Sequence, residues 1–289
     1  MAVEQITVET ERGQFTVRTA GAAEQPLVVC LHGFPDNAET FDALLEQLAS
    51  NGFRAVAPFC RGYAPSPLVN PDGTSFGKDL FEVLSKDALA VVEALAPGKP
   101  ASVVGHDNGA FTVYYLLALA PKRFQRAVTL TAGHPAAVFK NTARSPAQIW
   151  RSRYAFFFQI PGVSDWYVRK NNFAYLEKLW NDWSAPIWTP PREHINSVKQ
   201  TFAASFPSPL LHYRSGAFTA GENWALIKTP LLYLAGAADG CVLPETANGQ
   251  EKFFAGDFMS EIVPNAGHFL HLEKTAVVNQ KIIEWFEKE

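Results

Sequence analysis

One short segment of this 289-residue chain combines a carboxylate with the backbone freedom needed to present it as a nucleophile. Gly105 and Gly109 flank His106, Asp107 and Asn108, and the segment joins a strand-like run to a helical run. Glycines on either side permit a sharp strand-to-helix turn that lifts the middle side chain above a sheet. A carboxylate is ionised at pH 7, so Asp107 could attack a substrate without a base to remove a proton.

The product of such an attack indicates which reaction would be useful. Attack on an acyl carbon would give a mixed anhydride, whereas displacement at a saturated carbon gives an ordinary ester on Asp107. Water must then hydrolyse that ester, and imidazole titrates near neutrality, so His268 is the candidate base for the water. Asp239 could hold the correct tautomer of His268 and stabilise the imidazolium, with Glu245 as the rival acid.

These residues need a scaffold, and the chain alternates strand-like and helical patterns. Apolar or alternating runs predict strands at 5–9, 14–18, 26–31, 54–58, 101–105, 126–131, 230–235 and 260–263. Helical spacing predicts helices at 40–50, 78–95, 108–120 and 275–288, and a further helix after Pro244. The alternation indicates a mostly parallel central sheet with helices on both faces.

The alternation stops after His134. A long stretch rich in Trp, Phe, Tyr and Pro follows, with helical spacing and no convincing strand before Leu231. We therefore predict an α/β core at 1–134 and 223–289, interrupted by a helical cap at 135–222.

The segment around Asp107 resembles the nucleophile turn of the α/β-hydrolase superfamily, in the branch with an aspartate nucleophile: the epoxide hydrolases and haloalkane dehalogenases. Four other motifs resemble that family in order and at the expected strand ends. They are His32-Gly33-Phe34-Pro35, Arg61-Gly62-Tyr63 with Ser66, Leu234-Ala235-Gly236-Ala237-Ala238-Asp239 with Pro244, and Asn265-Ala266-Gly267-His268-Phe269. Pro65 departs from the second glycine that is common in the Arg-Gly segment. The resemblance covers essentially the whole chain and implies an α/β-hydrolase fold with a helical cap.

The resemblance also implies roles for individual residues. The backbone N–H groups of Phe34 and Asn108 would form the oxyanion hole. In epoxide hydrolases two cap tyrosines donate protons to the epoxide oxygen, and the matching positions here are Tyr154, seven residues before Pro161, and Tyr213 in the Tyr-Arg segment. A phenol with a pKa near 10 is protonated at pH 7 and can donate. The implied activity is opening of an epoxide to a diol.

Other interpretations stay open at several positions. Asp107 could be a helix N-cap, and Tyr154 and Tyr213 could be packing residues of the cap, with Tyr167 and Tyr175 as weaker candidates for the same acid role.

The residue after the nucleophile allows a second function. That residue is commonly Trp in both subfamilies, and this chain has Asn108, whose amide N–H₂ could still hold a halide. A haloalkane or haloacid dehalogenase with the same triad is therefore the second hypothesis. A ligand-binding member of the fold without turnover is the third.

Charge and composition narrow the class of partner. The chain has 25 Lys and Arg and 28 Asp and Glu, without a run of like charge. This pattern does not predict binding to nucleic acid or to an anionic membrane. No apolar run approaches the 18 or so residues of a membrane span. The first residues contain acids where a secretory signal has basic residues, which predicts a cytoplasmic protein.

Metals and cofactors are not expected either. Cys30, Cys60 and Cys241 are not closely paired, no histidine cluster has metal spacing along the chain, and no glycine-rich segment fits a phosphate. The expected partners are water and a small apolar or aromatic epoxide, and a homodimer is compatible with the sequence.

Overall fold

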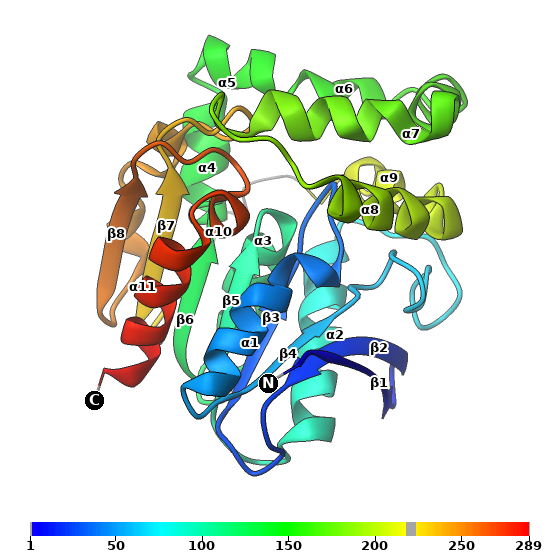
Figure 1. Cartoon of the computed structure of the whole chain (residues 1–289). Helices are drawn as coiled ribbons and strands as arrows, with labels where there is room; N and C mark the ends of the chain where they lie inside the picture. Colours follow the sequence, from blue (N-terminus) through cyan, green and yellow to red (C-terminus); the bar gives the residue numbers. More distant parts are fainter. Residues whose placement is uncertain (1, 218–223, 289) are drawn as a thin grey trace.

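Eight strands form one sheet, and its parallel strands all end at the same edge (Figure 1). The computed structural model describes residues 2–217 and 224–288. The strand order is β1-β2-β4-β3-β5-β6-β7-β8, and β2 is antiparallel to both of its neighbours. The strands are β1 (Glu4–Thr10), β2 (Gly13–Ala20), β3 (Leu27–Leu31), β4 (Arg54–Pro58), β5 (Ala101–His106), β6 (Phe124–Leu130), β7 (Leu231–Gly236) and β8 (Phe258–Val263).

Helices cover both faces of this sheet because the central strands are apolar on both sides. Every residue of β3 and β5 is buried. Apolar residues of α1 (Asp42–Ser50) and α11 (Thr275–Glu287) pack on one face, and those of α2 (Leu80–Leu95) and α3 (Asn108–Leu119) pack on the other. The predicted fold class, a mostly parallel sheet with helices on both faces, is confirmed.

A run of helices follows β6 and lies across the edge where the parallel strands end (Figure 1). We call α4–α9 the cap helices: α4 (Pro135–Thr142), α5 (Pro146–Arg151), α6 (Arg153–Phe158), α7 (Val163–Trp183), α8 (Arg192–Ser205) and α9 (Ser208–Arg214). The predicted cap end at 222 and core return at 223 lie outside the described residues, so the division into core and cap stays a prediction. None of the described helices has the length and apolar character needed to cross a membrane.

The helix predicted after Pro244 is wrong. Two short 3-10 helices occupy this region instead, η2 (Pro244–Ala247) and η3 (Gln250–Phe253). Gly249 separates them with a φ of 78°, in the left-handed region. A residue in this conformation ends a helix, so the chain turns before a full α-helix can form.

The turn between β5 and α3 depends on a close contact between α3 and β3. A Cβ added to Gly109 would lie 1.9 Å from the carbonyl oxygen of Leu31, far inside van der Waals contact. The first turn of α3 therefore packs directly on the end of β3. This contact brings Asp107 beside the loop that follows β3.

Replacing Gly109 by Ala should lower the free energy of unfolding by about 3 kcal/mol, because the obstructing atom belongs to the backbone and the added methyl group overpacks the core. Urea unfolding followed by circular dichroism measures this. Gly77→Ala is the matched control, since its added Cβ meets only the carboxylate of Asp79, at 2.9 Å, on a side chain that can move away. Equal unfolding midpoints for Gly109→Ala and wild type would contradict the prediction.

Candidate active site

Asp107 follows β5 in a backbone conformation that few residues adopt, with φ 53° and ψ −116°. Such a conformation costs about 1–3 kcal/mol and persists only where the surroundings enforce it. The side chain is buried, and Oδ1 accepts a hydrogen bond from the N–H of Phe34 at 2.9 Å. The N–H of Asn108 also donates to this carboxylate. Both backbone groups predicted for the oxyanion hole therefore contact Asp107.

Burial raises the pKa of Asp107 above its ordinary value. The nearby His268 and the hydrogen bonds from Phe34 and Asn108 act in the opposite direction, because each stabilises the ionised form.

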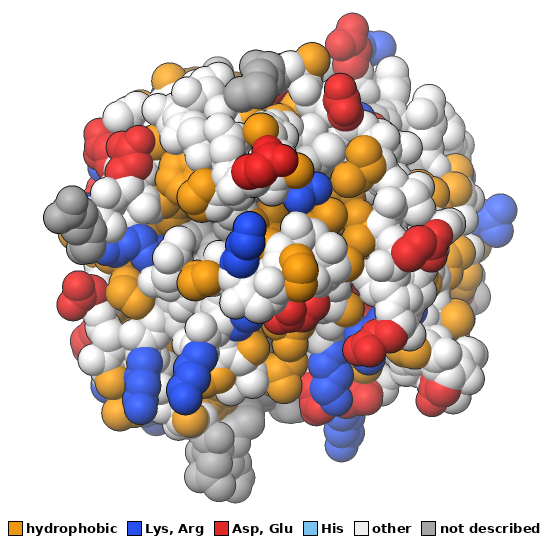
Figure 2. All heavy atoms as spheres, turned by 90° about the horizontal axis from the view of Figure 1, so that it is seen from below, with side chains coloured by type: hydrophobic (Ala, Val, Ile, Leu, Met, Phe, Trp, Pro, Cys, Tyr) orange, Lys and Arg blue, Asp and Glu red, His pale blue; other side chains and the backbone are white. Residues whose placement is uncertain are grey.

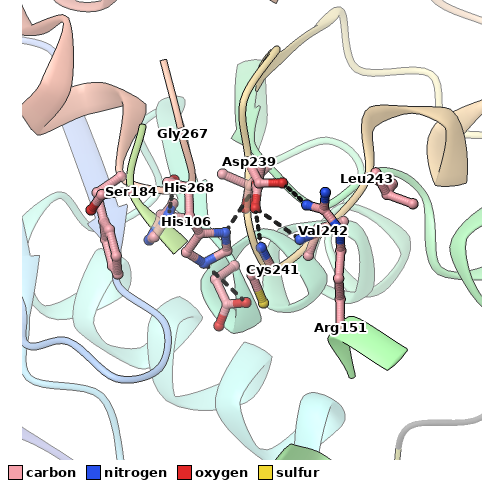
Figure 3. A network of polar contacts seen from close by, with 12 residues as sticks. His106, Arg151, Ser184, Asp239, Cys241, Val242, Leu243, Gly267 and His268 are labelled. Atoms are coloured by element: carbon pink, nitrogen blue, oxygen red, sulfur yellow. Dashed lines mark hydrogen bonds and ion pairs between the residues drawn. The ribbon is translucent and has the colours of Figure 1, made fainter. Parts of the chain in front are cut away.

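His268 lies between two carboxylates (Figure 3). Its Nδ1 donates to Oδ2 of Asp239 at 3.0 Å, since a carboxylate can only accept. This bond turns Nε2 toward Asp107, whose Oδ2 is 3.7 Å away. Oδ1 of Asp239 accepts from the N–H groups of Cys241 and Val242 at 2.7 and 2.8 Å, which fixes the carboxylate in place.

The negative charges of Asp107 and Asp239 affect the pKa of His268, which lies between them. Burial by itself would lower the pKa of His268, but Asp239, with which it shares a hydrogen bond, and then Asp107 outweigh burial, so the pKa is raised. The two carboxylates therefore make the protonated imidazole less unfavourable than it would be for a buried histidine without them.

The two predicted cap tyrosines meet near the same carboxylate. Tyr154 comes from α6 and Tyr213 from α9, and their side chains are hydrogen-bonded to one another. Burial raises the pKa of both phenols well above 10, and the negative charge of Asp107 adds to both shifts. The ring of Phe34 packs against both, with centroids 6.2 Å from Tyr154 and 5.0 Å from Tyr213.

The other histidines singled out in the sequence are buried in structural positions. His32 accepts from the N–H of Cys60 at 3.0 Å, and its other ring nitrogen lies 3.1 Å from the carbonyl oxygen of Gly33, so its hydrogen bonds are to backbone. His106 donates from Nε2 to the carbonyl oxygen of His268 at 3.0 Å (Figure 3). His271 is buried as well and shares a 2.7 Å hydrogen bond with Thr40.

A group of buried side chains behind His268 could hold a metal ion by its spacing. Asp36, His106 and His271 each place one ligand atom within 4.8 Å of the others, the one such group among the described residues. Sequence spacing missed it because the three residues are far apart along the chain: Asp36 follows β3, His106 ends β5, and His271 lies in the short helix α10 (Leu270–Glu273). We assign no ion to the group.

The rival residues lie elsewhere. Glu245, the alternative acid, lies in η2 and lines a different surface groove. The side chain of Tyr167 is 43% exposed, and the ring centroid of Tyr175 lies 5.3 Å from that of Tyr167. Both rings therefore lie on the outer part of the cap helices. Arg61 is buried in an ion pair with Asp87 at 2.6 Å, which indicates a structural role.

Three neighbours of the site were not predicted. The carbonyl of Trp183 accepts from the N–H of His268 at 2.9 Å, and its ring lies 5.2 Å from the imidazole. Sγ of Cys241 lies 3.6 Å from the phenol oxygen of Tyr154. Tyr63 has a buried hydroxyl without a hydrogen-bond partner among the described residues. The sequence signals were the position of Cys241, two residues after Asp239, and the Arg61-Gly62-Tyr63 motif.

Comparisons with known proteins agree with this architecture. Residues 26–275 match the family model described as the alpha/beta hydrolase fold. Epoxide hydrolase 3 of Xenopus tropicalis is 28% identical over 286 residues, covering 96% of this chain and 75% of that protein. The AB hydrolase superfamily protein YfhM of Bacillus subtilis (strain 168) is 26% identical over 287 residues, covering 94% of each.

Solved structures bear on the fold. The crystal structure of Bacillus megaterium epoxide hydrolase in complex with an inhibitor superimposes with a TM-score of 0.84, covering 98% of this chain and all of that chain. The sequences are 22% identical, so this likeness concerns the fold alone.

Replacing Asp107 by Asn should lower the pKa of His268, because one of the negative charges that raise it is lost while burial and Asp239 remain. A lower pKa means that the ring loses its proton at lower pH. A pH titration of the His268 ring signals by NMR measures the shift. Asp165→Asn, which removes a carboxylate from the Arg214 ion pair, should leave that pKa unchanged. An equal pKa in wild type and Asp107→Asn would refute the coupling.

Proposed function

The chain belongs to the α/β-hydrolase fold family, and we propose that it is an epoxide hydrolase acting through an ester on Asp107. The observation that carries the proposal is the pair of phenols, Tyr154 and Tyr213, whose ring centroids are 5.6 Å apart. Both rings pack on Phe34, whose N–H donates to Asp107. Relatives named epoxide hydrolase 3 and epoxide hydrolase 4 support it. Rings of Phe34 and Trp183 beside the site favour a small apolar or aromatic substrate.

In the first step, Oδ2 of Asp107 attacks a ring carbon of the epoxide. The ring carbon–oxygen bond breaks, and the oxygen takes a proton from Tyr154 or Tyr213. Since burial keeps the pKa of both phenols high, they are protonated at neutral pH and can donate. The step leaves a hydroxyalkyl ester on Asp107 and one tyrosinate, which accepts a hydrogen bond from the other phenol.

In the second step, Nε2 of His268 takes a proton from water while the water oxygen adds to Cγ of Asp107. Negative charge develops on Oδ1, which already accepts the N–H of Phe34. Collapse breaks the ester bond, and the imidazolium protonates the departing oxygen of the diol. The proton left on the Asp107 carboxyl group returns to the tyrosinate. Neither step needs a cofactor.

Ester formation would itself prepare the base. The charge of Asp107 contributes to the raised pKa of His268 in the free enzyme, and that charge disappears when the ester forms. The pKa of His268 therefore falls at the stage that needs a neutral imidazole. Asp239 keeps the ring oriented throughout.

A dehalogenase is the second candidate, because Nδ2 of Asn108 is buried without a hydrogen-bond partner among the described residues. This donor could hold a departing halide. The phenols favour an epoxide, since an alkoxide needs a proton whereas a halide leaves as a stable anion.

Changing both Tyr154 and Tyr213 to Phe should reduce diol formation from a styrene-type oxide by about 10²–10⁴-fold, because the ring-opening acids are lost. Product analysis measures the diol, and circular dichroism checks the fold. Tyr167→Phe, at an exposed ring of the cap helices, is the matched control and should stay active. Undiminished turnover in the double variant, or faster halide release from haloalkanes than diol formation in wild type, would favour the other candidate.

His268→Gln should leave the first step intact and stall the second, so the protein should gain the mass of one substrate molecule. Intact-protein mass spectrometry detects this adduct, and peptide mapping should place it on Asp107. Asp107→Ala should abolish it, and Asp239→Asn should slow hydrolysis less severely because the imidazole is retained. An adduct on another residue, or repeated turnover without His268, is incompatible with the mechanism.

A further inference from the structure

Six large apolar side chains lie exposed along 150–167 of the cap helices. They are Trp150, Phe156, Ile160, Val163, Trp166 and Tyr167, which we call the aromatic patch. The two tryptophans are 69% and 60% exposed. Single exposed apolar residues are common on protein surfaces, but a group of this size on neighbouring helices marks an interaction site.

The patch extends over the outermost layer of the molecule. Its residues lie on α5, α6 and α7 and the short connections between them, and these helices are farthest from the sheet in Figure 1. One groove is lined by Trp150, and a second is lined by Tyr167. Both grooves share Tyr175 and Lys178, so the two ends of the patch belong to one surface.

Positive charge accompanies this surface. The segment 135–217 contains 10 Lys and Arg against 4 Asp and Glu, and the rest of the chain contains 15 against 24. Arg153 lies over the ring of Trp150 at 4.7 Å, and Lys170 lies over that of Trp166 at 4.9 Å. On the opposite end of the molecule, acidic and basic side chains are interspersed (Figure 2). The near balance of charge over the whole chain therefore conceals a cationic cap.

We propose that the aromatic patch docks on the surface of an anionic phospholipid membrane. Tryptophan favours the interface between headgroups and acyl chains, and basic residues are attracted to anionic lipid. A second copy of this chain suits the patch less well, because two cationic surfaces would face each other.

Docking would place the groove beside Trp150 against the lipid. The groove beside Trp150 has a volume of about 460 Å³ and reaches Tyr154 and Trp183, which also line the candidate active site. An apolar epoxide dissolved in the bilayer could then enter without crossing water. This statement about the substrate rests on the proposed function, whereas docking itself does not.

Sedimentation with vesicles tests docking without any substrate, so its result is independent of the proposed function. Vesicles of phosphatidylcholine alone are compared with vesicles that also contain phosphatidylglycerol. We expect binding about tenfold tighter to the anionic vesicles, weakening at high salt because the charges are screened. Equal binding to both vesicles, or no binding to either, would overturn the proposal.

Paired variants assign the binding to the patch. Trp150→Ala with Trp166→Ala should reduce binding about tenfold or more, and Arg153→Gln with Lys170→Gln should remove the preference for anionic lipid. The matched controls remove exposed apolar groups and charges elsewhere: Met259→Ala with Val277→Ala, and Lys99→Gln with Lys122→Gln. All four altered side chains of the test variants are surface-exposed, so the fold should be retained.

Self-association is the competing outcome. Analytical ultracentrifugation of wild type and the tryptophan variant measures it. A wild-type dimer that becomes monomeric in Trp150→Ala with Trp166→Ala, together with no vesicle binding, would show that the patch is an interface between copies. Retained vesicle binding in both test variants would equally reject the patch as the docking surface.

Discussion

Asp107 occupies a backbone conformation that its own residue type disfavours, and the geometry of the site follows from that turn. The contact of Gly109 with Leu31 seats α3 on the end of β3, which leaves the chain no room to relax. The same contact brings the N–H of Phe34 to Oδ1 of Asp107. The strain is therefore offset by packing of α3, and the fold adds the donor of Phe34 to the local donor of Asn108.

Charges along the row of Asp107, His268 and Asp239 compensate for their burial. Removal from water disfavours every ionised form, raising the pKa of Asp107 and opposing protonation of His268. The attraction between the two carboxylates and the protonated form of His268 offsets part of this cost. The backbone N–H groups of Cys241 and Val242 complete it by holding Asp239. A row of this kind responds strongly when one member loses its charge.

The loop that follows β3 contacts both the active-site end of the sheet and the cap helices. Phe34 contacts Asp107 through its backbone and packs on Tyr154 and Tyr213 through its ring. Nearby, Nε1 of Trp180 donates to the carbonyl of Pro35 at 2.8 Å, linking α7 to the same loop. Packing of the cap helices thus determines where the phenols lie relative to the carboxylate. Chemistry at Asp107 is tied in this way to a distant part of the chain.

Local patterns in the sequence determined the strands, most helices and the turn at Asp107, because each depends on residues adjacent along the chain. The strand at 54–58 agrees residue for residue, whereas the helix after Pro244 failed at Gly249. Family motifs added His268 and Asp239, but only the tertiary structure decided their distances and brought Trp183 to the site. The contacts of the active site depend on how loops from separate strands converge. The aromatic patch and its basic neighbours depend on which side chains are exposed on the same surface. Neither is encoded in the spacing of neighbouring residues.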